Sequence, residues 1–382
     1  MLRRRIISIF LVVVLAVLLN KFLGVPWLIQ AFAVTPESPF VVSLVKNAVV
    51  ASVLVASSLW IAVVLHEIGH AIAGALSGFK ARVFTVGSLT WEWTGTRWRF
   101  ELIPKMLMGG SYHGTPQDMR NLAPRFALMA AGGIIVNLCI AGLAVASLKT
   151  LSLNSSTTTF WIVFLTCLFF VNTYLACFNL IPARTSGNVK NDGLELWRIA
   201  RGDLGVPRDM ASLMLLSRAR SGIKPRDWEL RLIETANALE DDSGEFATAR
   251  FIRFAYLMDR GETQAAGVAL DEAMTRIRHV NEVNRPNIWL EHANFLALHR
   301  NQPEAARCSF DEAAKYPVRP MFRLRAEAAI AFAERDYPRA VEKANAALED
   351  FKCWGKPVFA LDDAEELRAL MARAAASGAS AV

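Results

Sequence analysis

The residues best suited to chemistry are His66, Glu67 and His70, which form an H-E-x-x-H pattern. On an α-helix, residues four positions apart share one face, so the two histidines can bind one metal ion together. Imidazole nitrogens suit zinc, and zinc lowers the pKa of a bound water towards neutrality. Glu67 directly follows the first histidine and is placed to act as a general base. The pattern predicts a zinc site on a helix.

This triplet lies at the end of an apolar stretch rather than on an amphipathic helix. Residues 47–65, which precede His66, contain no charged side chain. Ionisable groups are costly in the hydrocarbon region of a membrane, so those found there usually serve a function. The alternative is a structural or vestigial pair of histidines. We favour a zinc site inside a membrane.

The composition indicates a membrane part and a soluble part. A mean hydropathy of +0.29 and a hydrophobic content of 53% are high for a purely soluble chain of 382 residues. Residues 1–200 carry 16 Lys and Arg against 7 Asp and Glu, whereas residues 201–382 carry 26 against 28. No basic patch dominates the second half, which argues against nucleic-acid binding. The five cysteines show no C-x-x-C spacing, so neither a disulfide framework nor a cysteine zinc site is expected.

Four apolar segments predict four membrane-spanning helices. They cover residues 6–25, 40–76, 124–147 and 160–178. The first segment also fits a signal peptide cleaved at Ala31-Phe32-Ala33, but its long distance from that site favours a retained helix. The expected outer segments, residues 26–45 and 150–159, contain no Lys or Arg, while the N-terminus and the inner loops do. By the positive-inside rule, both termini are expected in the cytoplasm.

Residues 78–120 are predicted to form a cytoplasmic loop with a β-hairpin. Large aromatic residues flank the turn Thr94-Gly95-Thr96, namely Trp91, Trp93, Trp98 and Phe100. Such aromatic faces suit a hairpin that lies at the membrane surface or partly enters it. A small soluble hairpin with its own packed core is the alternative.

Residues 202–382 are predicted to be soluble and helical. Paired alanines seven positions apart recur at Ala266/Ala273, Ala306/Ala313 and Ala340/Ala347. Each pair accompanies a helix-turn-helix with a polar turn, and small residues there let paired helices pack closely. The pattern resembles tetratricopeptide repeats, although the consensus Trp and most glycines are missing. Generic helical hairpins are the alternative.

The predicted fold is therefore an all-α membrane protein with four transmembrane helices, a small β-hairpin loop and a cytoplasmic α-helical repeat domain. We expect a membrane helix and short outer loop in residues 1–39, a catalytic membrane domain in residues 40–201 and the repeat domain in residues 202–382.

The motifs together resemble the site-2 protease family of intramembrane zinc metalloproteases. They are His66-Glu67-x-x-His70, a glycine-rich span with Asn137, and Asn179-x-x-Pro182 followed by Asp192-Gly193. The resemblance covers roughly residues 45–200.

This resemblance implies a role for each matched polar residue. His66, His70 and Asp192 would be the protein ligands of one Zn2+, with the fourth position open to water. Glu67 would accept a proton from the attacking water and pass it to the leaving amine. Asn137 would steady the scissile backbone or the oxyanion.

A further segment, Gly109-Gly110-Ser111 before Tyr112, is similar to a family loop that lends an edge strand to the substrate. There is an independent physical reason for such a strand. A helical substrate hides its peptide bonds in its own hydrogen bonds, and unwinding it in lipid requires replacement partners, which strand addition supplies.

Three departures from the family pattern stand out. Ile134 occupies the position of a proline before Asn137, and the gap from Asn179 to Asp192 is about five residues longer than is common. Glu195 is therefore an alternative third ligand. No PDZ insertion separates the third and fourth spans, so partner recognition is expected to fall to the helical repeats.

We expect a zinc metalloendopeptidase that cleaves membrane-protein substrates in or near the bilayer, in the inner membrane of a bacterium. A protein partner or regulator is expected at the helical repeats, and no nucleic acid. A catalytically inactive membrane scaffold is the alternative, although it has no use for costly intramembrane charges. A metal transporter would need polar residues through several spans.

Overall fold

Two compact units make up the described part of the chain. The computed structural model describes residues 40–93, 97–102, 109–151, 156–185, 188–353 and 360–379. The first unit extends to Asp203 and the second begins at Leu204, while the short segments 93–98 and 187–189 group with the second. The predicted first membrane helix, residues 6–25, lies outside the described residues.

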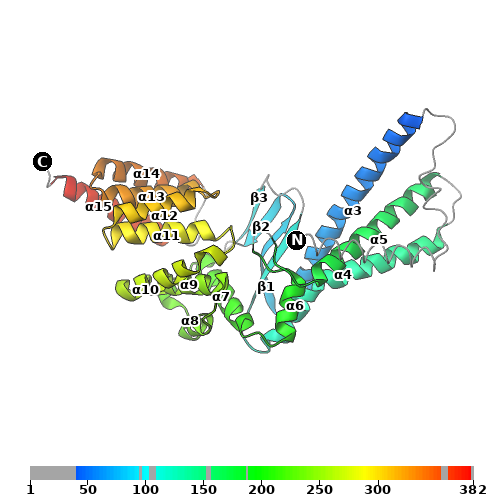
Figure 1. Ribbon diagram of the computed structural model, residues 1–382, viewed down its shortest axis with the longest axis horizontal. Helices are drawn as coiled ribbons and strands as arrows, with labels where there is room; N and C mark the ends of the chain where they lie inside the picture. The colour runs from blue at the N-terminus through cyan, green and yellow to red at the C-terminus, as the bar shows by residue number, and fades with distance from the viewer. Residues whose placement is uncertain are drawn as a thin grey trace. The chain divides into compact units, whose positions relative to one another are not determined.

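Three long helices dominate the first unit (Figure 1). They are α3 (Phe40–Leu76), α4 (Leu122–Thr150) and α5 (Ser156–Leu180), and each packs against the other two. Their stretches Ser52–Leu76, Leu122–Thr150 and Phe160–Leu180 are long and apolar enough to cross a membrane. These helices correspond to three of the four predicted spans and support an integral membrane protein.

Helices α3 and α4 approach each other closely at a pair of glycines. A Cβ added at Gly69 would lie 2.5 Å from the carbonyl oxygen of Gly132, and a Cβ at Gly132 would lie 2.4 Å from that of Gly69. Any larger residue at either position would separate the backbones. This contact brings α4 against the part of α3 that carries the H-E-x-x-H pattern.

The loop between α3 and α4 forms a four-stranded sheet rather than a lone hairpin. Its strands are β1 (Phe79–Val86), β2 (Leu89–Trp93), β3 (Trp98–Leu102) and β4 (Gly110–Pro116), in the order β3-β2-β1-β4. Strand β1 pairs antiparallel with both β2 and β4. The first hairpin turns at Gly87, whose φ of 54° suits a two-residue turn between Val86 and Leu89. The predicted second turn, residues 94–96, lies outside the described residues.

A short helix follows α5. Helix α6 (Asp192–Ala200) begins after Asn191, whose side-chain oxygen accepts the N–H of Leu194 and caps the helix. It packs against α4 and α5, so the residues at its start are held near the end of the helical bundle.

The second unit is helical throughout its regular structure (Figure 1). Its helices are α7 (Gly205–Arg220), α8 (Leu230–Asn237), α9 (Gly244–Asp259), α10 (Thr263–Thr275), α11 (Arg285–Leu298), α12 (Pro303–Ala314), α13 (Pro320–Ala333), α14 (Tyr337–Cys353) and α15 (Ala360–Ala379), with short 3-10 turns at Pro225–Asp227 and Ile277–His279.

Pairs of these helices form the predicted hairpins: α9 packs on α10, α11 on α12 and α13 on α14. All six paired alanines are buried, at most 1% exposed. The connecting turns contain Gly261, Asn301 and Arg335 with positive φ. The hairpins are thus observed, whereas their assignment as tetratricopeptide-like repeats stays a prediction.

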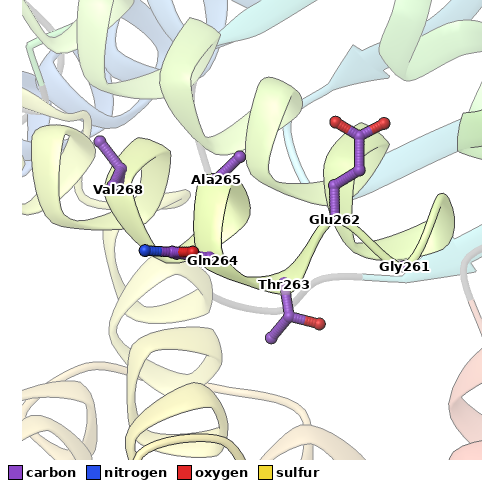
Figure 2. A pocket seen from close by; sticks show the side chains of 6 residues that line it. All are labelled: Gly261, Glu262, Thr263, Gln264, Ala265 and Val268. Atoms are coloured by element: carbon purple, nitrogen blue, oxygen red, sulfur yellow. The ribbon is translucent and has the colours of Figure 1, made fainter.

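An open hollow lies at the turn between α9 and α10 (Figure 2). It is lined by Gly261, Glu262, Thr263, Gln264, Ala265 and Val268. All of these except Thr263 are exposed, and none is a buried polar group aimed at a ligand. This hollow therefore lacks the buried polar groups of a built site.

Candidate metal centre

His66 and His70 lie on the same face of α3, one helical turn apart. Their Nε2 atoms are 3.1 Å apart, and both side chains are buried. Two nitrogens at this distance need either a shared proton or a cation between them.

The other ring nitrogen of each histidine decides between these possibilities. Nδ1 of His70 lies 2.8 Å from the carbonyl oxygen of Met129, which can only accept a hydrogen bond. A longer approach of the Gly133 N–H to the same nitrogen, at 3.4 Å, is the weaker contact. Nδ1 of His66 lies 2.5 Å from Oδ1 of Asn137. In the neutral imidazoles both Nδ1 atoms therefore carry the proton, and both Nε2 atoms present lone pairs to each other.

The orientation of the Asn137 amide is itself fixed by its neighbours. Its Nδ2 donates to Oδ1 of Asn172 at 2.7 Å and approaches the carbonyl oxygen of Ala62 at 3.3 Å. Asn172 in turn donates to the carbonyl oxygen of Leu168 at 2.8 Å. Asn137 and Asn172 are fully buried, so the oxygen of Asn137 is held towards His66.

Asp192, the first residue of α6, completes the group. Its Oδ2 lies 3.1 Å from Nε2 of His66 and 3.4 Å from Nε2 of His70. Burial raises the pKa of Asp192, but when the neighbouring imidazoles of His66 and His70 are protonated, their hydrogen bonds and positive charge outweigh burial and lower the pKa to about 2. Asp192 is therefore a carboxylate at neutral pH and supplies a negatively charged oxygen.

These three atoms fit a tetrahedral metal ion. A zinc site with bonds of about 2.0–2.1 Å places its ligand atoms about 3.3 Å apart, and the three observed separations lie between 3.1 and 3.4 Å. Among the described residues, His66, His70 and Asp192 are the group of histidine, cysteine and acidic side chains that can hold a metal ion together. Two imidazole nitrogens and one carboxylate oxygen leave one position open.

Glu67 lies beside this group and against strand β4. Its buried carboxylate lies near the backbone N–H of Tyr112. A Cβ added at Gly110 would lie 2.6 Å from Oε1 of Glu67. The carboxylate is thus held between the two histidines and the edge strand of the sheet.

Helix α4 makes room for the imidazoles at Gly133. A Cβ at this position would lie 2.6 Å from Cε1 of His66 and 2.6 Å from Nε2 of His70. A side chain here would therefore enter the space that the metal ligands occupy. On α4, Gly132 allows the close contact with α3, and Gly133 leaves room for the two imidazoles.

A further glycine lets α6 reach the bundle. A Cβ at Gly193 would lie 2.5 Å from the carbonyl oxygen of Asn179 and 2.3 Å from that of Leu180. Because Gly193 follows Asp192 directly, this close contact places the carboxylate near the histidines.

The structure brings together most of the predicted site residues, whose catalytic roles stay predictions. His66, His70, Asp192, Glu67 and Asn137 converge as described. The side chain of Asn137 contacts His66 rather than open space. This contact favours a role in orienting the His66 ring over the predicted role of binding the substrate oxyanion.

The other predicted residues lie outside the metal group, either at strand β4 or on helix α6. Gly109 accepts the N–H of Gly87, and Ser111 pairs with Thr85, so the predicted substrate segment belongs to the start of β4. Glu195 instead pairs with Arg198 at 3.0 Å and lies outside the metal group.

Three asparagines near the metal group were given no role by the sequence analysis, although Asn179 belongs to its N-x-x-P motif. Nδ2 of Asn179 lies 3.4 Å from Nε2 of His66, Asn172 fixes Asn137, and Asn191 caps α6. Asn179 could have been found from its N-x-x-P motif, and Asn172 from its cost inside an apolar span. Asn191 carried no signal beyond its position before Asp192.

One comparison with known proteins bears on the part of the site that α3 carries. Residues 54–154 match the profile described as Peptidase family M50, a range that includes His66, Glu67 and His70 but ends before Asp192. No curated protein and no solved structure matches the chain. Residues 54–154 are therefore a peptidase family M50 domain, which implies that the protein is a peptidase.

Proposed function

We propose that this protein is an intramembrane zinc metalloprotease of the site-2 type, which hydrolyses peptide bonds of membrane-protein substrates in or near the bilayer. One observation carries the proposal. The Nε2 lone pairs of His66 and His70 and an oxygen of Asp192 have the spacing of a tetrahedral zinc site, and the two histidines lie on a helix apolar enough to span a membrane.

The residues present fit zinc. His66 and His70 would bind the ion through Nε2 and Asp192 through a carboxylate oxygen, while Asn137 and the carbonyl of Met129 hold the rings. When bound, zinc supplies Lewis-acid chemistry and makes water nucleophilic near neutral pH.

Glu67 supplies the proton transfers. Its carboxylate accepts a proton from the attacking water and later gives it to the nitrogen of the leaving amine. This carboxylate lies against Gly110 of strand β4, so the proton is moved beside the histidines and the edge strand.

Strand β4 is suited to hold the substrate. It is an edge strand of the sheet, and its first residue, Gly110, contacts Glu67. An extended substrate segment paired with this edge would have its peptide bonds satisfied as it passes Glu67. Asn179, near Nε2 of His66, is placed to donate a hydrogen bond to the reacting carbonyl.

Two other features support a membrane topology and a type of partner. We infer cytoplasmic termini in a bacterial inner membrane, because the expected outer segments 26–45 and 150–159 contain no Lys or Arg, whereas the N-terminus and the expected inner loops do. Helical hairpins such as those of the second unit commonly present surfaces to proteins, which supports a protein partner or regulator there.

Exchange of Glu67 tests the proposal. Glu67→Gln should keep one zinc per chain, measured by plasma mass spectrometry, and abolish cleavage because the amide cannot accept the proton. Substrates are then the membrane proteins that accumulate with this variant and co-purify with it but are cleaved by wild type. Glu195→Gln is the control and should retain zinc and cleavage.

Two results would overturn the proposal. One is purified wild-type protein without zinc after reconstitution with the metal, which would favour a scaffold. The other is undiminished cleavage of the captured proteins by Glu67→Gln.

A further inference from the structure

A polar loop connects α5 to α6, and two backbone contacts join its ends. The backbone N–H of Asn191 donates to the carbonyl oxygen of Ala183 at 3.1 Å, and Arg184 forms a β-bridge with Lys190. This loop contains the additional residues between Asn179 and Asp192. A longer loop defines the position of the residue that follows it less tightly, unless its ends are fastened together.

The side chain of Asn191 fastens these ends. Its Nδ2 donates to the carbonyl oxygens of Asn179 at 2.8 Å and Ile181 at 3.0 Å. Its Oδ1 accepts the backbone N–H of Ala183 at 2.9 Å and that of Leu194 at 3.1 Å. The amide therefore uses both donor hydrogens and both acceptor positions.

These four bonds connect two parts of the metal centre. The carbonyls lie in the last turn of α5 and just after it, where the Asn179 side chain reaches His66. The Leu194 N–H belongs to the first turn of α6, which begins with Asp192. No other natural side chain of this size offers two donors and two acceptors, so Asp, Ser and Leu each lose part of the connection.

We propose that Asn191 is a positioning residue for Asp192, which holds the carboxylate at the two histidines despite the long loop before it. The inference rests on the proposed zinc site and concerns how this chain completes it. Asn191 itself does not touch the metal ligands; it acts by tying the start of α6 to the end of α5.

The test is a double-mutant cycle on zinc affinity of the full chain in detergent, measured by competition with a chelator. Asn191→Ala should raise the Kd for zinc by about 10- to 100-fold, the range typical for residues that orient metal ligands. Asn191→Asp keeps the helix cap and the acceptors but loses both donors, so it should fold and still bind zinc more weakly than wild type. In an Asp192→Ala background, Asn191→Ala should change the Kd less than about twofold, because its effect passes through Asp192.

Ser243→Ala provides the matched control. Ser243 caps α9 by accepting the N–H of Phe246 at 3.1 Å, so its loss removes a cap of the same kind far along the chain. It should leave the Kd for zinc unchanged.

The possible results separate the two proposals. A wild-type Kd in Asn191→Asp, or an undiminished effect of Asn191→Ala in the Asp192→Ala background, overturns the role of Asn191 alone. Failure of the wild-type protein to bind zinc overturns the proposed function and this role with it.

Discussion

Gly110 of strand β4 lies directly against the side chain of Glu67, although the two are separated by the end of α3 and most of the sheet. A Cβ at Gly110 would lie 2.5 Å from Cγ of Glu67 and 2.6 Å from Oε1. The backbone of the edge strand and the proposed base are therefore in contact. Because Gly110 has no side chain, a peptide paired with β4 would pass the Glu67 carboxylate with nothing from this position in between.

Gly110→Ala should therefore displace the Glu67 carboxylate while leaving the histidines in place. A misplacement of about 1 Å can cost about 100-fold in rate, and we expect a loss of that size in cleavage of captured substrates. Zinc content should stay at one per chain. Loss of zinc together with activity would contradict this prediction, since it would show that the contact supports the metal group.

Gly133→Ala should weaken zinc binding, in contrast to Gly110→Ala, which should keep it. The added methyl group would meet His66 and His70 at 2.6 Å, and overpacking of this kind costs about 1–3 kcal/mol. We expect the Kd for zinc to rise by about 10- to 100-fold. Gly142→Ala on the same helix meets nothing within 4 Å and should bind zinc like wild type; an equal loss in both variants would point to helix α4 in general.

The amide pair Asn137 and Asn172 should control zinc binding through His66. Asn137→Leu removes the acceptor at Nδ1 of His66, and we expect the Kd for zinc to rise by about 10- to 100-fold. Asn172→Leu leaves that acceptor but frees the amide of Asn137 to rotate, so its effect should have the same direction and be smaller. An unchanged Kd in Asn137→Leu would return Asn137 to the role of binding the substrate oxyanion.

The grouping of the two histidines proposed as metal ligands was predictable from the sequence for a simple reason. His66 and His70 are four residues apart, and helix geometry alone places them on one face. Asp192 was reached through the resemblance of its motif, but its position depends on Asn191 and Gly193, whose contacts with α5 no spacing rule supplies.

Other features depend on how elements pack and could not be read from the pattern. Whether Asn137 faces a histidine or an open cavity depends on the rotation of α4, which the contact between Gly69 and Gly132 determines. The pairing of β1 with β4 joins segments far apart in the loop, and its register is not encoded in either strand alone. The alternation of residues predicted a hairpin, and the resemblance predicted an edge strand near Gly110, but neither predicted that β1 pairs with both β2 and β4 in one sheet.

Acid should destabilise the second unit through His292. Burial lowers the pKa of His292 below its ordinary 6.5, with smaller and opposed contributions from Asp271 and Arg300. The folded state therefore binds fewer protons than the unfolded state, so stability is present above about pH 6.5 and lost as the pH falls below it.

The difference between the free energies of unfolding of the second unit at pH 7.5 and at pH 5.5 measures this loss. Burial also lowers the pKa of His299. The slope with pH should be steepest in wild type, shallower in His292→Gln and shallower still when His299→Gln is added. Equal slopes in all three proteins would rule out these histidines as the cause.

The sheet should contact the bilayer through strand β3. Phe100 and Leu102 lie on one face of this strand and are 56% and 64% exposed, although both are large and apolar. Only short connections separate the sheet from the membrane helices, since α3 ends at Leu76 and β1 begins at Phe79. Exposed apolar groups at this distance from a membrane are stabilised by entering its interface.

Depth-dependent quenching tests this contact. In a background without the native cysteines, a bimane label at Phe100→Cys should be quenched strongly by brominated lipids in reconstituted vesicles. The same label at Arg99→Cys reports the opposite face of the strand, where Arg99 pairs with Glu101 at 2.9 Å, and should be quenched weakly. Neighbouring residues of a strand point to opposite faces, so equal quenching at the two positions would show that no single face meets the lipid. Weak quenching at both positions would favour a soluble hairpin with a packed aromatic core.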